Sequence, residues 1–241
     1  MQEGLFLLLI AVMAFLYASV GHGGASGYLA MMALFGVAPS LMKSSALVLN
    51  VFVSILSFVQ FYRAGFFRWQ LFWPFAVASV PFAYWGAQQP ITDSLYKQLL
   101  SVALLIAIAR MLFQPNDSAP NKPAYLPLSL VVGAIIGFLS GMLGIGGGII
   151  LSPVILLLGW AKVKEAAAVS ALFIFVNSIS ALSSLFRTGF VPSPQLLSWL
   201  SAALVGGFWG AYQGGFKFNI PTLRYVLAGV LVIACVKLYF T

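Results

Sequence analysis

Gly144-Ile145-Gly146-Gly147-Gly148 separates two apolar runs in the middle of this 241-residue chain, and Gly21-His22-Gly23-Gly24-Ala25 does the same 123 residues earlier. The whole chain is 62% hydrophobic and 7% charged, with a mean hydropathy of +1.04. A soluble surface normally carries about a quarter charged residues. The composition therefore predicts an all-α, polytopic membrane protein in which the two glycine segments interrupt helices.

The charged residues carry a topology signal. Twelve Lys and Arg against four Asp and Glu give a net charge of +8, and the basic residues lie almost entirely in short breaks between apolar runs. That distribution is typical of membrane-protein loops, so we expect the lipid bilayer, and no nucleic acid, as a partner. The single cysteine excludes an intramolecular disulfide and a CxxC site. We expect no metal or cofactor.

The chain contains two copies of a unit of roughly 120 residues. Besides the glycine segments, matching pairs recur within about two residues of a 124-residue spacing: Gly36 and Gly159, Ser45-Ala46-Leu47 and Ser170-Ala171-Leu172, Arg63-Ala64-Gly65-Phe66 and Arg187-Thr188-Gly189-Phe190, and Trp85-Gly86-Ala87 and Trp209-Gly210-Ala211. A segment rich in Pro, Asn and Ser separates the copies. We expect a first repeat at 1–113, a linker at 114–125 and a second repeat at 126–241.

Each repeat is expected to contain a glycine-broken helical hairpin followed by three transmembrane helices. The apolar runs are 4–20, 27–38, 44–62, 70–89 and 95–113 in the first repeat, and 126–143, 148–160, 166–186, 194–213 and 220–240 in the second. A spanning helix needs about 20 residues, and the two runs of one hairpin are together too long for a single crossing. Whether the hairpin crosses twice or dips in and returns, the number of crossings per repeat is odd. Parity therefore predicts inverted repeats.

The basic residues favour this inverted arrangement. In the hairpin topology eight Lys and Arg fall on one side of the membrane and four on the other, whereas eight spans in parallel repeats divide them six and six. The cytoplasmic side of a membrane protein collects Lys and Arg. We therefore expect an inner-membrane protein with both termini on the non-cytoplasmic side.

The glycine breaks are the candidate substrate site. Non-helical backbone persists inside a membrane only where protein or a water-filled cavity covers it. A helix that restarts after a break carries about half a unit of positive charge at its first N–H groups, and glycine lets a ligand approach the backbone. These features predict an anion site lined by Gly21, Gly23, Gly24, Gly144, Gly146, Gly147 and Gly148.

Tight helix packing is the alternative role for glycine in a membrane protein. Small residues at four-residue spacing indicate packing seams, and three such series are Gly133, Gly137 and Gly141; Gly206, Gly210 and Gly214; and Ser79, Ala83 and Ala87. The clustered glycines of the breaks do not follow this spacing, which favours a ligand-lining role for them.

The second repeat resembles a known family. Its glycine segment is followed by Pro153, by Ala166-Ala167-Ala168-Val169-Ser170-Ala171, by Arg187-Thr188-Gly189 and by Gly206-Gly207-Phe208-Trp209-Gly210-Ala211. This order resembles the TauE/SafE family of sulfite and organosulfur-anion exporters, and the resemblance extends over both repeats. It implies a transporter of a small anion. The first repeat departs from the pattern because Ala25 replaces the third glycine and His22 stands at the position of Ile145.

Polar side chains near the breaks are further candidate ligands. His22, the only histidine, either donates to an anion, carries a coupled proton, or bonds a nearby carbonyl as a neutral residue. Buried amides and hydroxyls in a span bind helices together or line a path. The other candidates are Ser26, Ser45, Asn50, Ser170 and Asn177.

Three basic residues are candidates for gating. Lys43 precedes the run at 44–62, while Arg63 and Arg187 follow the equivalent runs of the two repeats. Reaching out to the membrane interface is the ordinary role of such residues. The fork of an arginine also suits a sulfonate where it turns inward.

We therefore expect a secondary carrier that exports a small anion, sulfite or an organosulfonate, by alternating access around the breaks. The chain has no Walker motif, and the membrane potential or a proton gradient supplies the energy. A passive anion channel is the alternative. An intramembrane enzyme is less favoured because the sequence contains no GxSxG, no HExxH and no second histidine.

Overall fold

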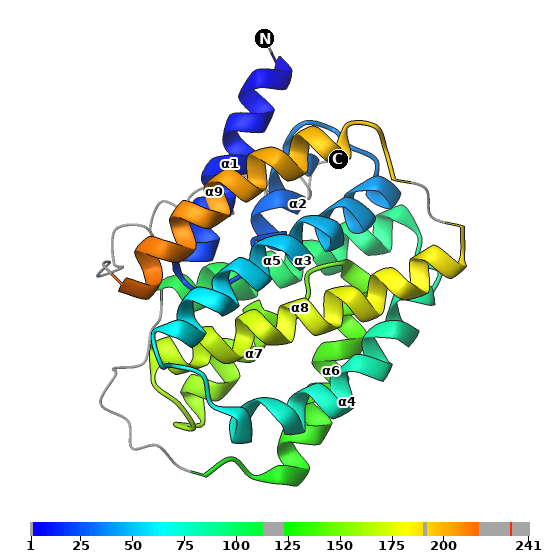
Figure 1. The fold of residues 1–241 in the computed structure, drawn as a ribbon. Helices are drawn as coiled ribbons and strands as arrows, with labels where there is room; N and C mark the ends of the chain where they lie inside the picture. The colour runs from blue at the N-terminus through cyan, green and yellow to red at the C-terminus, as the bar shows by residue number, and fades with distance from the viewer. Residues whose placement is uncertain (1, 113–122, 190–191, 217–231, 233–241) are drawn as a thin grey trace.

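The structure is a computed structural model that describes residues 2–112, 123–189, 192–216 and 232. Within these residues the fold is all-helical, as the composition predicts (Figure 1). The helices are α1 (Gln2–Ser19), α2 (Ala25–Leu34), α3 (Pro39–Arg63), α4 (Trp69–Gln88), α5 (Asp93–Leu112), α6 (Leu126–Leu143), α7 (Gly148–Leu157), α8 (Val163–Arg187) and α9 (Leu196–Phe216).

Helix lengths recur along the chain. Both α1 and α6 have 18 residues, α2 and α7 have 10, and α3 and α8 have 25. Left-handed glycines recur 123 or 124 residues apart, in the pairs Gly21 and Gly144, Gly24 and Gly147, Gly36 and Gly159, and Gly65 and Gly189. The apolar run at 220–240 and most of the linker at 114–125 lie outside the described residues.

Two helix starts differ by three or more residues from the hydropathy-based limits. Helix α3 begins at Pro39 rather than 44, and α8 begins at Val163 rather than 166. Proline suits the first helical position because its missing N–H has no acceptor there. In α8 the Glu165 carboxylate accepts the Lys162 backbone N–H at 2.9 Å. Polar first turns are thus helical, although an apolar run does not include them.

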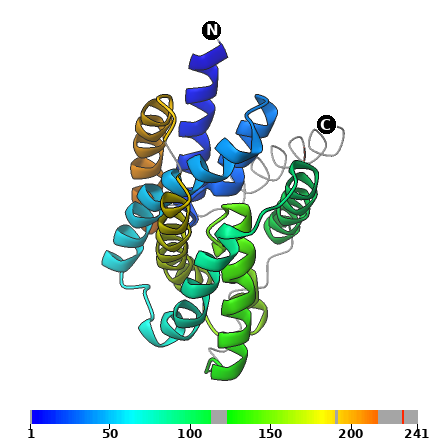
Figure 2. The same ribbon diagram turned by 90° about the vertical axis from the view of Figure 1, so that its right-hand side faces the viewer.

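The helices of the two halves pack reciprocally. Helix α1 packs along α9 and α6 packs along α4, while α3 and α8 cross in the middle and also contact α9 and α4 (Figures 1 and 2). Figure 1 places the start of α1 at the top of the molecule and the start of α6 at the bottom. Each half therefore completes its packing with helices of the other half.

The small-residue series form the seams between these pairs. A Cβ on Gly206, Gly210 or Gly214 would meet the carbonyl oxygens of Ala11, Phe15 and Ser19 on α1, and Gly133, Gly137 and Gly141 face Phe75, Ser79 and Ala83 on α4 in the same way. These glycines allow two backbones to approach closely, which is the packing role expected from their spacing.

We expect Gly210→Ala to destabilise the protein by about 1–3 kcal/mol, because its new methyl group would collide with the Phe15 carbonyl. Thermal unfolding of the purified protein in detergent measures the change. Gly4→Ala is the matched control, since a Cβ there has nothing within 4 Å. An unchanged melting temperature for Gly210→Ala would contradict the seam.

The helices divide into spanning and short classes. Among the described residues, Pro39–Arg63, Leu126–Leu143 and Val163–Arg187 are long and apolar enough to cross a membrane. Helices α2 and α7 have 10 residues each, so they reach about 15 Å, half of the hydrocarbon thickness. Both short helices begin at a glycine break, and the residues of both breaks are buried, so the breaks lie inside the helical bundle.

Candidate functional site

Both glycine breaks end on a left-handed glycine that precedes a short helix. Gly24 precedes α2 with φ of 94° and Gly147 precedes α7 with φ of 80°, and neither supplies a side chain to cap the first turn. Side chains larger than hydrogen are strained in this left-handed region. The backbone therefore requires glycine at both positions, and the opening N–H groups of each short helix have no cap from these residues.

The breaks meet at the crossing of α3 and α8. A Cβ on Gly23 would lie 2.6 Å from Asn50 Oδ1 and 2.9 Å from Ile174 Cγ2, and one on Gly146 would lie 3.0 Å from Asn50 Nδ2 and 2.7 Å from Ile174 Cγ2. Asn50 comes from α3 and Ile174 from α8. The same two side chains thus touch both breaks and bring Gly23 and Gly146 together, whereas Cβ positions on Gly21 and Gly147 meet Ala167 and Phe173 instead.

Several buried polar atoms at this site have no hydrogen-bond partner among the described residues. They are both amide atoms of Asn50, the hydroxyl of Ser178 and the hydroxyl of Tyr28. Ser178 Oγ lies 3.1 Å from the Cβ position of Gly146, and Tyr28 Oη lies 2.6 Å from that of Gly24. We call Asn50, Ser178 and Tyr28 the break cluster. An unpaired buried polar atom costs about 1–3 kcal/mol, so the break cluster is suited to pair with a polar ligand.

His22 connects the first break to the other half of the chain. Its Nδ1 lies 2.9 Å from the Val20 carbonyl oxygen, and its Nε2 lies 3.2 Å from Ser152 Oγ. Ser152 Oγ in turn lies 2.6 Å from Ser170 Oγ. All three side chains are buried, with His22 only 1% exposed. The bond to a nearby carbonyl is one of the three roles that the sequence allows for His22.

The other sequence candidates have different surroundings. Ser26 donates to Tyr17 Oη at 2.7 Å, and Asn177 Nδ2 donates to the Phe173 carbonyl of its own helix at 2.8 Å. Ser45 is fully buried, and its hydroxyl has no partner among the described residues. Ser26 thus makes a local hydrogen bond, whereas Asn177 pairs only its amide nitrogen and leaves Oδ1 without a partner among the described residues.

The two halves place different side chains at equivalent positions of the site, a polar one in one half and an apolar one in the other. Helices α3 and α8 have the same length and begin 124 residues apart, which makes Ile174 the equivalent of Asn50. The contacts of Gly23 and Gly146 follow this same pairing. The sequence match of Ser45 with Ser170 is therefore displaced by one residue, because Ala46 is the structural equivalent of Ser170.

The three basic candidates separate. Lys43 adjoins the second break, since a Cβ on Gly144 would lie 2.9 Å from its carbonyl oxygen, but its ammonium group donates to the Ala87 carbonyl at 2.9 Å. Arg63 and Arg187 are exposed in the last turns of α3 and α8. Arg187 lies over the Tyr84 ring at 6.0 Å. The structure brings Lys43 to the breaks and leaves both arginines at helix ends.

At one end of the molecule, the side chain of Arg68 links two segments by hydrogen bonds. Arg68, just before α4, donates from Nη1 to the Trp160 carbonyl at 2.9 Å and to Glu165 Oε2 at 3.5 Å. The Trp160 ring is buried and packs on Phe75 with 6.1 Å between ring centroids. We call Arg68, Trp160 and Glu165 the end latch. The end latch joins the residue before α4 to the connection between α7 and α8 and to the first turn of α8.

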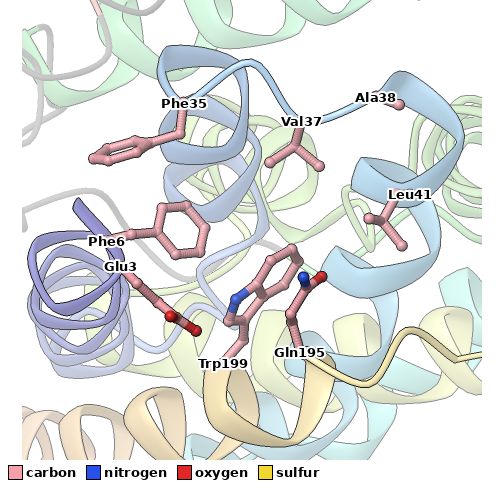
Figure 3. Close-up of a pocket in the computed structure, with 8 residues that line it drawn as sticks. All are labelled: Glu3, Phe6, Phe35, Val37, Ala38, Leu41, Gln195 and Trp199. Carbon is pink, nitrogen blue, oxygen red and sulfur yellow. The ribbon is translucent and has the colours of Figure 1, made fainter. Parts of the chain in front are cut away.

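The opposite end has a hollow of about 310 Å³ at the equivalent positions. Val37 stands there 123 residues before Trp160, and Leu41 stands 124 residues before Glu165. Figure 3 shows Glu3 and Gln195 on either side of Trp199, with Phe6 and Phe35 beside Glu3 and with Val37 and Leu41 beyond the indole. A valine and a leucine thus line this hollow at the positions where the end latch has its tryptophan and its glutamate.

Comparison with known proteins adds to these observations. The family model described as sulfite exporter TauE/SafE matches residues 5–238. The probable membrane transporter protein y4hK of Sinorhizobium fredii is 35% identical, over 94% of each chain. The probable membrane transporter protein YjnA of Bacillus subtilis is 21% identical, over 90% of this chain and 92% of the relative. No solved structure matches the chain. The protein thus belongs to the sulfite exporter TauE/SafE family of membrane transport proteins.

Proposed function

We propose that the protein is a secondary carrier that exports a small anion, with its binding site at the glycine breaks. The observation behind this proposal is the position of Asn50. Its buried amide lies beside Gly23 and Gly146, the breaks that precede the two short helices, and both of its polar atoms lack a partner among the described residues. Helix starts carry partial positive charge and present N–H groups to anions. The amide, the hydroxyls and the helix starts together suit an oxyanion.

The charge distribution supports an anion over a cation. The acidic residues of the described chain are Glu3, Asp93 and Glu165, and each occupies the first turn of α1, α5 or α8. The break cluster contains only an amide and two hydroxyls, so it has no carboxylate to attract a cation. The family description and this chemistry favour sulfite or an organosulfonate as the substrate.

Alternating access is the mechanism that the two ends support. Reciprocal packing of the halves and the opposite directions of α1 and α6 support two inverted repeats, at 1–113 and 126–241. In that arrangement the end latch closes the cytoplasmic side, and the hollow at Val37 and Leu41 faces outward. The excess of basic residues on the latch side supports this orientation, with both termini outside the cytoplasm.

The membrane potential favours export. An inside-negative potential contributes about 2.3 kcal/mol per charge for each 100 mV, and for an anion this force points outward. Counterflow in proteoliposomes tests the proposal with labelled sulfite, sulfate, sulfoacetate and chloride. A carrier accelerates labelled efflux when unlabelled substrate is present on the opposite side. Transport without such acceleration would identify a passive channel, and no transport of any of these anions would contradict the proposal.

The two ends give a prediction on accessibility. In a Cys235→Ser background, we expect Leu41→Cys to react with a membrane-impermeant maleimide and Ala166→Cys to remain protected, because Leu41 lines the hollow and Ala166 is fully buried beside the end latch. Adding Arg68→Gln to the Ala166→Cys variant is expected to raise its labelling rate about tenfold, as the latch opens. Equal labelling of the two cysteines would contradict a closed latch end.

A further inference from the structure

A buried chain of three side chains links the two halves of the molecule. It runs from His22 in the first break to Ser152 on α7 and then to Ser170 on α8, with distances of 3.2 Å and 2.6 Å between successive polar atoms. Ser170 also lies beside the second break, because its carbonyl oxygen is 3.2 Å from the Cβ position of Gly148. The chain therefore reaches from one glycine break to the start of the short helix at the other.

The acceptor at the first end fixes the direction of these hydrogen bonds. A backbone carbonyl only accepts, so Nδ1 of His22 carries the proton that it shares with Val20. Nε2 of the neutral imidazole then has a lone pair and accepts from the Ser152 hydroxyl. Ser152 has a single O–H, so Ser170 must donate to it. Both hydroxyl protons consequently point toward His22.

We propose that proton binding to His22 reverses this chain and presents the Ser170 hydroxyl to the transported anion. A proton on Nε2 makes that nitrogen a donor, so Ser152 accepts from it and rotates its own O–H toward Ser170. Ser170 then accepts from Ser152, and its O–H is released to another acceptor. One proton is bound at Nε2, each serine keeps its proton, and no covalent bond to carbon or oxygen changes.

The reversal rests on the proposed function and makes anion binding at the breaks depend on a proton at His22. Protonation adds a positive charge at His22 and a free donor at Ser170, and both changes strengthen binding of an anion at the breaks. Anion binding and proton binding would then be linked, as the binding of any two ligands that favour the same state is. The inference assigns Ser152 as the positioning residue, because it touches His22 and Ser170 and has no assigned contact with substrate.

Other ionisable side chains on the surrounding helices have separate partners or positions. Tyr17 on α1 accepts from Ser26, Tyr28 on α2 lies at Gly24, and Lys43 on α3 donates to the Ala87 carbonyl. On α8, Lys164 and Glu165 lie in the first turn and Arg187 in the last. Helix α7 contributes none within Gly148–Leu157. Histidine is the side chain that ordinarily changes charge between pH 5 and 8, so the proposal assigns the bound proton to His22.

Nitrogen NMR tests the direction of the chain without any transport assay. The protein has one histidine, so ¹⁵N-histidine labelling of the purified full chain gives one pair of ring signals. We expect the neutral form to carry its proton on Nδ1, and we expect Ser152→Ala to shift the Nε2 signal while the Nδ1 signal stays in place. Ser152→Thr keeps the hydroxyl and is expected to restore the Nε2 signal. A neutral form protonated on Nε2, or an Nε2 signal that Ser152→Ala leaves unchanged, would overturn the proposal.

Anion binding tests the coupling. Methanesulfonate keeps one negative charge between pH 5 and 8, so it separates titration of the protein from titration of the ligand. We expect its dissociation constant to fall about tenfold on acidification in the wild type and in Ser152→Thr, and to change less than about twofold in Ser152→Ala. Equal pH dependence in all three proteins would overturn the coupling. Absence of anion binding at any pH, together with the expected ring signals, would instead count against the proposed carrier.

Discussion

Asn50→Leu is expected to reduce transport at least about tenfold while it makes the empty protein more stable. The amide of Asn50 is fully buried, and both its polar atoms lack a partner among the described residues. Leucine has nearly the same shape and no polar atom to desolvate. Removing the unpaired amide is therefore expected to stabilise the substrate-free protein by about 1–3 kcal/mol. Stability and transport then change in opposite directions, as they do where a site is kept polar for a ligand.

Two measurements check this result on one purified sample. Thermal unfolding in detergent gives the stability, and efflux of labelled sulfite from proteoliposomes gives the transport rate. Substrate is expected to raise the melting temperature of the wild type, because a ligand that binds the folded state stabilises it, and to leave that of Asn50→Leu unchanged. Wild-type transport in Asn50→Leu would remove the amide from the site.

Asn177→Leu provides the matched control. This second amide lies on α8 and donates to the Phe173 carbonyl of the same helix at 2.8 Å. Its replacement removes one hydrogen bond together with an Oδ1 that has no partner among the described residues, so we expect a smaller gain in stability than at Asn50. Two buried asparagines that the sequence alone does not distinguish thus differ in expected stability gain, because Asn177 makes one hydrogen bond and Asn50 makes none among the described residues.

This contrast shows which features the sequence predicts. Hydropathy locates the described helices because apolar length is a local property, and the four-residue spacing of Gly206, Gly210 and Gly214 identifies a seam because a helix repeats every 3.6 residues. The breaks follow from clustered glycines for the same local reason. Each of these predictions depends on residues that are neighbours in the sequence.

The features that sequence reasoning missed depend on the crossing of distant helices. Ser152 and Tyr28 lie within apolar helices, and nothing in their immediate sequence separates them from packing residues. Ser152 stands one turn after Gly148, and that position is the only local signal that points to it. The end latch joins Arg68 to Glu165 across 97 residues. A hydrogen bond between the two halves can be identified only when the structure shows how the halves pack against each other.

Gly146→Val is the second large expected effect, a loss of at least nine-tenths of transport from a protein that still reaches the membrane. A valine there would bring Cβ to 2.7 Å from Ile174 Cγ2 and 3.0 Å from Asn50 Nδ2, and its methyl groups would extend further into the site. The residue also has φ of 70°, which strains any side chain. Two costs therefore act at Gly146, and a control has to separate them.

Gly189→Val is the control, because it introduces the backbone strain without a steric clash. Its φ is 87°, close to that of Gly146, but a Cβ at Gly189 has nothing within 4 Å. Both variants are strained by about 1–2 kcal/mol because of their left-handed backbone, so a difference between them measures the space at the break. We expect Gly189→Val to keep most of its transport, and Gly146→Ala to fall between the two valine variants. Normal transport by Gly146→Val would mean that the anion does not pass the break, because a valine that fills the space beside Asn50 leaves no room for a ligand there.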